Sequence, residues 1–181
     1  MNKSIKFMPT LIDGAIIILP KENSADFVFD EETYNLKDMS KHGIKSTFVQ
    51  DNEVMSKKGV LRGLHYQKNY SSERIVRVIF GKIYDVAVDM RDGSPTFGKW
   101  HAEILSSENH KQFYLANGLA HGYYVMEDNT IVAYKTTTFW HPEREIGIPW
   151  NDPYLNIEWP IPIGESPLLT EKDKSYPPLV Y

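Results

Sequence analysis

The sequence predicts an all-β protein, either a sandwich or a barrel, with few short helices. Short runs rich in β-branched and aromatic residues recur along the chain, and 11 glycines and 11 prolines are spread between them, as turns between many strands require. Few stretches place apolar residues at the 3.6-residue period of a helix. No repeat and no linker divides the 181 residues, so we expect a single domain over residues 1–181.

The clearest pair of strands is expected at residues 77–80 and 83–90, on either side of a Gly-Lys pair. In the second run, Asp85 and Asp89 fall on the same face as Ala87, because successive side chains of a strand point to opposite faces. A face that carries two carboxylates is either exposed to water or lines a pocket.

The other elements are expected from the same signals. A short helix is expected over residues 30–41, and the proline-rich tail from Trp150 is expected to wrap the surface as loops. Further strands are expected at residues 99–105, 112–116, 121–126 and 130–140.

Composition excludes several classes of protein. The chain has no cysteine, so disulfides, thiolate catalysis and cysteine zinc sites are ruled out. A net charge of −4 argues against broad binding to nucleic acid or acidic membranes, but it leaves room for a basic pocket that holds one phosphorylated small molecule. The longest apolar stretch near the start, residues 15–19, is too short for a transmembrane helix or a signal peptide. We therefore expect a soluble, cytoplasmic protein.

The densest candidate chemistry lies in residues 59–67, GVLRGLHYQ. His65 is a candidate general base near neutral pH, and Arg62 is a candidate phosphate ligand. A spacing of three places them on opposite faces of an ideal strand, but Gly63 between them indicates a bulge or a close backbone approach that would re-aim one side chain. Taken alone, such a pair is more often a hydrogen-bonded core histidine and a surface arginine.

A metal site is not expected. Many β-barrel proteins hold metals through a His-x-His pair, whereas this stretch reads His65-Tyr66-Gln67. The remaining histidines are scattered, so a histidine site would have to assemble from distant strands.

Several motifs follow one another in a fixed order along the chain. They are RGLHYQ at 62–67, IYDVAVDMRDGSPTFGKW at 83–100, GLAHGY at 118–123, YKTT at 134–137 and GIPWNDPYLNIEWP at 147–160. Together they resemble the dTDP-4-dehydrorhamnose 3,5-epimerase family, from about Thr47 to the end of the chain and more weakly from Gly14. The resemblance implies a cupin-like jelly roll (a double-stranded β-helix), a homodimer, and no metal or organic cofactor. It also implies an enzyme that inverts C3 and/or C5 of a nucleotide-linked 4-keto-6-deoxy sugar through an enolate.

Such a reaction needs a base, a group that stabilises the enolate oxygen, and an acid. The resemblance makes His65 the base, Asp173 in LTEKD the carboxylate that supports it, and Tyr134 the acid. Asp85 matches a family carboxylate that pairs with a lysine near the sugar O4. Arg74 stands in place of that lysine, keeps its positive charge on a larger planar group, and is expected to pair with Asp85.

The resemblance also assigns residues that hold the substrate. Arg62 matches the phosphate-binding arginine, His121 matches a histidine that lines the diphosphate region, and Gln50 and Asn52 match further substrate contacts. Trp140 stands where the family often has tyrosine. It is expected either to stack on the substrate or to be an ordinary core or edge aromatic residue.

One family motif is incomplete near the start of the chain. The family's D-x-R-G-x-F-x-E, whose arginine and aromatic residue reach the nucleotide partly across the dimer, corresponds to ENSADFVFDEE at 22–32. The Arg-Gly pair is missing, while Phe27 and Phe29 persist, so Phe29 is expected to contact the substrate. A dTDP-linked sugar is the expected substrate, and GDP- or CDP-linked sugars are alternatives.

Three other functions stay open at this point. A single-centre 3- or 5-epimerase would use the same scaffold, and so would a 3,4-ketoisomerase, although such isomerases tend to carry the His-x-His pair. A catalytically silent sugar-nucleotide binding protein would keep the fold without the chemistry.

Overall fold

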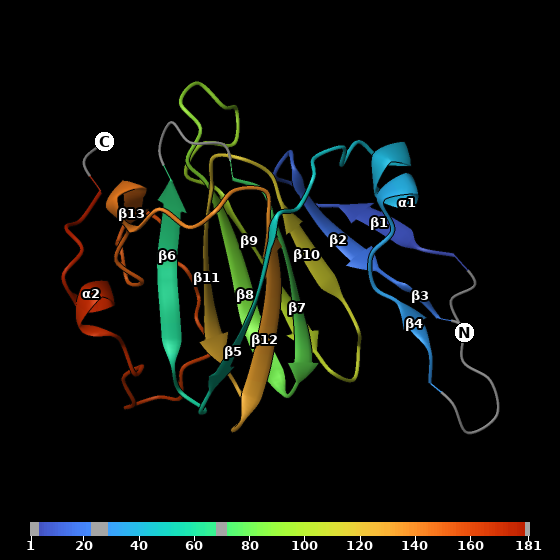
Figure 1. The fold of residues 1–181 in the computed structure, drawn as a ribbon. Coiled ribbons are helices and arrows are strands. Elements are labelled where there is room, and N and C mark those ends of the chain that lie inside the picture. Colours follow the sequence, from blue (N-terminus) through green and yellow to red (C-terminus); the bar gives the residue numbers. More distant parts are fainter. Residues whose placement is uncertain (1–3, 23–28, 68–71, 180–181) are drawn as a thin grey trace.

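Two β-sheets pack face to face in the computed structural model of the protein, which describes residues 4–22, 29–67 and 72–179 (Figure 1). One sheet has six strands in the order β1-β2-β10-β7-β12-β5, and the other has five in the order β13-β6-β11-β8-β9. The strand pairs within both sheets are antiparallel. This arrangement confirms the all-β jelly roll that the sequence predicts.

The strands of the six-stranded sheet are β1 (Lys6–Pro9), β2 (Ala15–Leu19), β5 (Gln50–Ser56), β7 (Arg74–Phe80), β10 (Gln112–Leu115) and β12 (Thr130–Thr136). Those of the five-stranded sheet are β6 (Leu61–Gln67), β8 (Lys82–Asp89), β9 (Trp100–Ser106), β11 (Leu119–Val125) and β13 (Glu145–Gly147). A separate two-stranded sheet contains β3 (Lys21–Glu22) and β4 (Glu31–Glu32). The helical segments are α1 (Leu36–Lys41), α2 (Glu171–Lys174) and a 3-10 turn (Pro142–Arg144). None of these helices has the length and apolar character that crossing a membrane requires.

Two predicted elements are shorter than the sequence suggested. The prediction of a helix over residues 30–41 is wrong in its first half, because residues 31 and 32 pair with β3 instead. The helix begins only after Asn35, whose side chain accepts a hydrogen bond from the backbone nitrogen of Lys37 at 3.0 Å and so caps it. The strand predicted over residues 130–140 ends at Thr136, whose hydroxyl donates to the carbonyl of Thr138 at 2.8 Å.

The inner faces of the two sheets meet in an apolar core. Ile17 and Phe113 of the six-stranded sheet pack against Ile83, Leu105 and Val125 of the five-stranded sheet, and all five side chains are almost completely buried. Burying a side chain of this size stabilises the fold by roughly 1.5–3 kcal/mol. The core holds the two sheets, and therefore the residues that project from them, at a constant separation.

The tail of the chain covers the outer face of the five-stranded sheet. Ile148 and Leu155 are buried against Leu64 and Val86 of that sheet. The indole nitrogen of Trp100 donates to the carbonyl of Leu155 at 2.9 Å. The tail thereby brings α2 alongside β6, as Figure 1 shows. The predicted proline-rich loops are present, and they carry one short helix that the sequence did not indicate.

Gly63 marks the bulge that the sequence predicts in β6. Its φ is +105°, and a Cβ atom there would lie 2.6 Å from the carbonyl oxygen of His121. The pairing of β11 with β6 shifts register between His121 and Tyr123, next to this close approach. The bulge lets Arg62 and His65 line the same cavity, although their spacing would place them on opposite faces of an ideal strand.

Candidate active site

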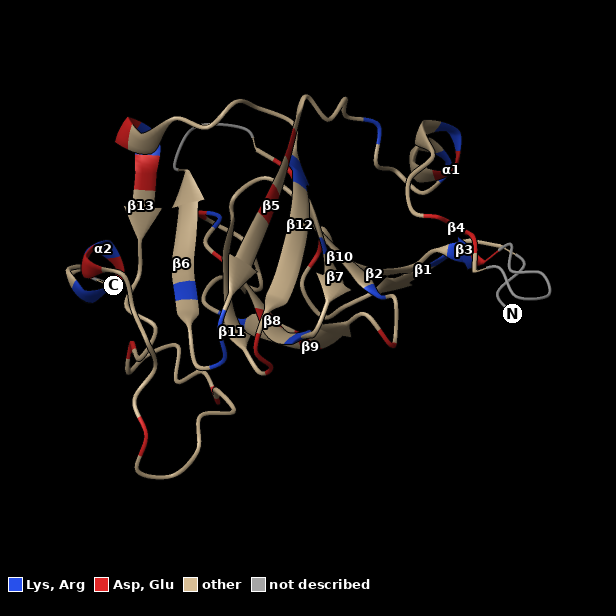
Figure 2. Ribbon diagram, turned by 60° about the horizontal axis from the view of Figure 1, so that its bottom comes forward, with Lys and Arg blue, Asp and Glu red and all other residues tan. Residues whose placement is uncertain are grey.

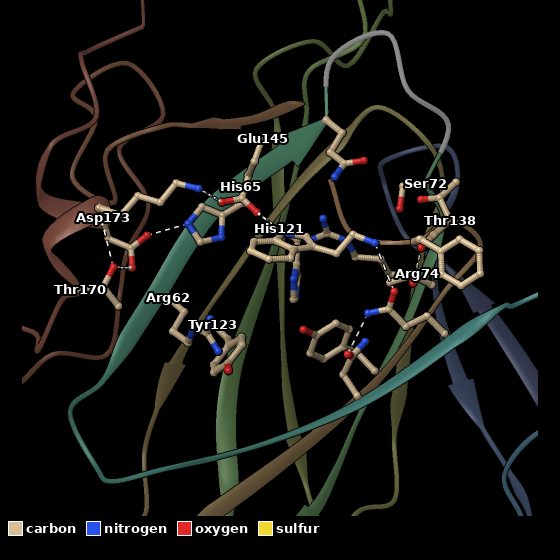
Figure 3. Close-up of a pocket in the computed structure, with 18 residues that line it drawn as sticks. Arg62, His65, Ser72, Arg74, His121, Tyr123, Thr138, Glu145, Thr170 and Asp173 are labelled. Carbon is tan, nitrogen blue, oxygen red and sulfur yellow. Dashed lines mark hydrogen bonds and ion pairs between the residues drawn. The ribbon is translucent and has the colours of Figure 1, made fainter. Parts of the chain in front are cut away.

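A cavity of about 480 Å³ is lined by residues from both sheets and from the tail (Figure 3). It contains most of the residues that the sequence singled out. These are Gln50, Asn52, Arg62, His65, Arg74, His121, Tyr134, Trp140 and Asp173. Asp85 and Phe29 do not line it.

His65 and Asp173 face each other at one side of the cavity (Figure 3). The Nε2 atom of His65 lies 2.6 Å from Oδ1 of Asp173. Thr170 caps α2: its hydroxyl accepts from the backbone nitrogen of Asp173 at 3.1 Å and donates to Oδ2 of the same residue at 2.7 Å. Because this cap holds the carboxylate, Asp173 is a buried partner of His65 and not a solvated tail charge.

The electrostatics of Asp173 favour its ionised form. Burial raises the pKa of this carboxyl, but the hydrogen bonds from His65 and Thr170 outweigh burial and hold the pKa below its ordinary value. An ionised carboxylate accepts the proton on Nε2 of His65, so the basic electron pair of the ring lies on Nδ1. This is the arrangement that a general base requires.

A second histidine–carboxylate pair lies beside the first. Nε2 of His121 is hydrogen-bonded to Oδ1 of Asp85, and both side chains are buried. His121 is also the cross-strand neighbour of His65 in the pairing of β11 with β6. Asp85 therefore lies behind the cavity and acts on it through His121. The expected ion pair between Asp85 and Arg74 is absent from the described residues: Oδ1 of Asp85 binds His121, and its buried Oδ2 has no hydrogen-bond partner there.

Arg74 and Tyr134 come from the opposite sheet. Arg74 on β7 pairs with Thr136, and Tyr134 on β12 pairs with Val76, so the two side chains lie two positions apart on the same face. Burial lowers the pKa of Arg74 below its ordinary value, and the charge of Glu145 offsets only part of this effect. An arginine with its intrinsic pKa above 12 stays charged under both influences. Figure 3 places Arg74 across the cavity from Asp173.

Arg62 lies beside a buried tyrosine. Burial lowers the pKa of Arg62, but Tyr123, Tyr134 and Asp173 together raise it above its ordinary value. The hydroxyl of Tyr123 is buried, and burial raises its pKa. A charged guanidinium held among these groups is suited to bind a phosphate.

Gln50, Asn52 and Trp140 form the edge of the cavity. Nε2 of Gln50 donates to Oδ1 of Asn52 at 2.9 Å, and the backbone nitrogen of Trp140 donates to Oε1 of Gln50 at 3.2 Å. Trp140 is 62% exposed, so it is not a core residue. It lies where a flat ligand group can stack on it.

Phe29 and Asp89 lie outside the cavity, and their contacts show what each side chain does. Phe29 is 55% exposed and stacks on His110 with ring centroids 4.7 Å apart, so it reaches no ligand in the cavity of its own chain. Phe27 lies outside the described residues. Asp89 is fully buried and binds Arg91, and neither Asp89 nor Asp85 lines the cavity.

The sequence reasoning missed several residues that border the cavity. Glu145 is the most prominent: Nζ of Lys172 donates to its Oε1 at 2.6 Å, and the indole of Trp140 donates to its Oε2 at 3.4 Å. Burial raises the pKa of Glu145, but Lys172, His65 and Trp140 outweigh burial and lower it. Of the elements that border β6 here, β13 carries the acidic Glu145 and α2 carries charges of both signs (Figure 2).

A sequence signal existed for some of these residues. Lys172 directly precedes Asp173 in LTEKD, and Tyr123 follows His121 by two positions on one strand. Glu145 ends the run PERE, which is typical of a solvated turn, so only its tertiary contacts identify it.

Comparison with known proteins agrees with this geometry. The sequence profile of the dTDP-4-dehydrorhamnose 3,5-epimerase family matches residues 9–180. The dTDP-4-dehydrorhamnose 3,5-epimerase of Methanothermobacter thermautotrophicus is 44% identical over 174 residues, which cover 96% of this chain and 94% of that protein.

Solved structures show the same relationship. The dTDP-6-deoxy-D-glucose-3,5-epimerase of Legionella pneumophila, in complex with dTDP-4-keto-L-rhamnose, has a TM-score of 0.90 at 44% identity, covering 95% of this chain and 91% of that one. The 3,5-epimerase of Bacillus anthracis, with TDP and PPi bound, has a TM-score of 0.92 at 39% identity, covering 97% and 100%. The chain therefore belongs to the dTDP-4-dehydrorhamnose 3,5-epimerase family, and it is an epimerase of nucleotide-linked 4-keto-6-deoxy sugars.

Proposed function

We propose that the protein inverts both C3 and C5 of dTDP-4-dehydro-6-deoxyglucose, with His65 as the base and Tyr134 as the acid. The observation that carries this proposal is the placement of the two groups. The His65–Asp173 pair projects from the five-stranded sheet and the tail, while Tyr134 and Arg74 project from the six-stranded sheet into the same cavity. A sugar ring between the sheets has one group on each of its faces, as inversion of a carbon centre requires.

The reaction is redox-neutral and begins with removal of a proton next to the C4 ketone. Nδ1 of His65 takes the proton from C3 or C5, and Asp173 stabilises the imidazolium that forms. The electron pair moves onto the C4 oxygen, where the Arg74 guanidinium stabilises the enolate. As the enolate electrons return to re-form the C4 ketone, Tyr134 donates its phenolic proton to the carbon from the opposite face, which inverts the centre. His65 then releases its proton to solvent and Tyr134 regains one from solvent, so both groups are ready for the second centre.

The remaining cavity residues hold the nucleotide sugar. Arg62 supplies a charged fork for the diphosphate, and His121, kept in place by Asp85, lies next to His65 on the adjoining strand. Gln50 and Asn52 offer amide groups to the substrate. The buried Nδ2 atom of Asn52 has no hydrogen-bond partner within the described residues, so it is available to a ligand. Trp140 provides an exposed ring at the edge for stacking.

We also propose that the enzyme is a homodimer in which Phe29 reaches the cavity of the second subunit. The resemblance of residues 22–32 to the family's nucleotide-binding motif supports this, as does the exposure of Phe29 away from the cavity of its own chain. Light scattering of the purified protein tests the dimer, and a mass of 20.9 kDa would contradict it. The single domain over residues 1–181 and the cytoplasmic location stay predictions, which limited proteolysis and cell fractionation test.

Proton exchange tests the catalytic proposal. The protein is incubated in D₂O with dTDP-4-dehydro-6-deoxyglucose, and deuterium at each carbon is followed by NMR. Wild type is expected to introduce deuterium at both C3 and C5, whereas H65A is expected to introduce none. H42A is the matched control, because His42 stacks on Phe7 away from the cavity and its loss should leave exchange unchanged.

Three outcomes would contradict the proposal. Deuterium at one carbon alone would make the protein a single-centre epimerase. Exchange at wild-type rates in a folded H65A variant would remove His65 from the mechanism. No exchange with this sugar, but exchange with a GDP- or CDP-linked ketosugar, would overturn the choice of nucleotide.

A further inference from the structure

The ring of Tyr176 occupies the space where residue 147 would otherwise carry a side chain. A Cβ atom placed on Gly147 would lie 2.1–2.2 Å from three atoms of that ring. Gly147 is the cross-strand partner of His65 in the pairing of β13 with β6. Because paired residues project from the same face of a sheet, Tyr176 fills the side-chain position of one of the two cross-strand neighbours of His65, the other being His121.

The Tyr176 ring meets the imidazole of His65 edge to face. The two ring centroids are 5.7 Å apart, and the ring planes are inclined by 78°. Aromatic rings favour this arrangement over direct stacking. Tyr176 follows Asp173 by three residues and lies just beyond the C-cap of α2, Ser175, so one short segment of the tail contacts His65 in two ways.

The two contacts constrain different motions of the imidazole. The hydrogen bond from Nε2 to Asp173 points that nitrogen at the carboxylate, but it leaves the ring able to tilt and turn about the bond. A flat ring packed at an angle of 78° blocks that movement. With both contacts in place, Nδ1 keeps one direction into the cavity.

The hydroxyl group of Tyr176 contributes nothing to this arrangement. Its oxygen is buried and has no hydrogen-bond partner within the described residues. Burial, and then the charges of Asp173 and Glu145, raise the pKa of this phenol far above its ordinary value, so the group is neutral. A buried hydroxyl without a partner costs stability, which makes the aromatic ring the useful part of the side chain.

We propose that Tyr176 is a positioning residue for the reaction: its ring, admitted by the missing side chain of Gly147, sets the plane of the His65 imidazole so that Nδ1 faces the sugar. This inference rests on the proposed function, in which His65 is the base. A base that is misplaced by about 1 Å can lose about 10²-fold in rate.

Steady-state kinetics of three variants test the proposal. Y176L removes the flat ring but keeps an apolar side chain, and it is expected to lower kcat by about 10- to 100-fold with little change in KM. Y176F keeps the ring, and its kcat is expected to match wild type. G147A inserts a methyl group where the ring lies and is expected to lower kcat as Y176L does, with every cavity side chain still present.

Y84L is the matched control for lost tail packing. Tyr84 packs edge to face on Trp159 of the tail, with centroids 6.1 Å apart, and it touches neither His65 nor the cavity. Y84L is expected to lower Tm while kcat stays unchanged. A loss of kcat in Y84L as large as in Y176L would assign the effect to tail packing and overturn the inference.

The other outcomes separate this inference from the function on which it rests. If H65A is inactive while both Y176L and G147A keep wild-type kcat, Tyr176 does not position the base. Equal losses in Y176F and Y176L would shift the role to the hydroxyl and would also overturn the proposal. If H65A itself keeps wild-type turnover, the proposed function fails, and the role of Tyr176 fails with it. If Y176L does not fold, G147A still tests displacement of the ring and Y176F still tests loss of the hydroxyl.

Discussion

The Nε2 atom of His65 lies 2.6 Å from Oδ1 of Asp173, although 108 residues separate the two along the chain. The contact forms because the tail packs over the outer face of the five-stranded sheet and carries a short helix capped by Thr170. His65 lies on strand β6 of the five-stranded sheet, whereas the carboxylate on which it depends, that of Asp173, comes from the tail.

Replacing Asp173 by asparagine tests that dependence. D173N keeps the shape of the side chain but removes the charge that stabilises a protonated His65, so kcat is expected to fall by about 10²–10⁴-fold. Steady-state turnover measures the loss, and thermal unfolding confirms that the variant is folded. A folded D173N with wild-type turnover would show that His65 works without the carboxylate.

Replacing Tyr134 by phenylalanine separates removal of the proton from its return. In Y134F the base is intact, so protons next to the ketone are expected to exchange with D₂O, while inversion is expected to drop by about 10²-fold or more because no acid serves the opposite face. NMR of the recovered sugar measures deuterium content and configuration in one sample. If inversion and exchange fall in parallel in Y134F, or if neither falls, Tyr134 is not the acid.

Arg74 is expected to tolerate lysine better than a neutral residue. R74K keeps a cation within reach of the enolate oxygen and is expected to retain most activity, whereas R74Q is expected to lower kcat by about 10²–10³-fold. Both variants leave Asp85 hydrogen-bonded to His121, so the comparison isolates the charge. Equal kcat in R74K and R74Q would mean that the guanidinium serves binding or packing and not the enolate.

Asp89 is expected to affect stability rather than turnover. Its carboxylate accepts hydrogen bonds from Nη2 of Arg91 at 2.7 Å, from the hydroxyl of Ser94 at 2.6 Å and from that of Thr96 at 2.6 Å. D89N removes the negative charge that Arg91, Ser94 and Thr96 bind and leaves the half-buried Arg91 without its charged partner, so it is expected to lower the free energy of unfolding at pH 7 by about 2 kcal/mol. Urea denaturation measures the change.

The pH dependence of that difference follows from the pKa of Asp89. Burial raises this pKa, but the hydrogen bonds from Arg91, Ser94 and Thr96 outweigh burial and hold it well below its ordinary value of 3.8. A carboxyl with a depressed pKa in the folded state contributes stability that is complete above the unfolded value and is lost as the pH falls below it. The difference in free energy of unfolding between wild type and D89N should therefore become smaller from pH 7 to pH 3. A difference that does not depend on pH would contradict the role of the Asp89 carboxylate in stability.

Local patterns predicted the parts of the fold and site that depend on neighbours in sequence. The strands on either side of Gly81 were confirmed because β-branched residues and a glycine turn specify them locally. The bulge at Gly63 was also predicted, since only a glycine tolerates that close approach. The helix over residues 30–41 failed in its first half, because pairing with β3 decided the structure there.

The site shows the same division. The chemistry of their side chains pointed to His65 and Arg62, and the family resemblance assigned His121, but the hydrogen-bond partner of His121 did not follow from spacing. Asp85 was expected to bind Arg74 and instead binds His121. Glu145 carried no signal, because a carboxylate in a charged run looks solvated until Lys172 and Trp140 are packed around it.

The sequence by itself determined the all-β class, the absence of cysteine chemistry, and the family to which the ordered motifs belong. Those features depend on residue type and on period-two patterning, which are local properties of the chain. The family resemblance had already paired Asp173 with His65, and the structure shows that contact, whereas only the tertiary structure decided that Asp85 meets His121 and that the Tyr176 ring lies on Gly147. Each of these contacts joins elements far apart in sequence, and its geometry is set by how the two sheets and the tail pack together.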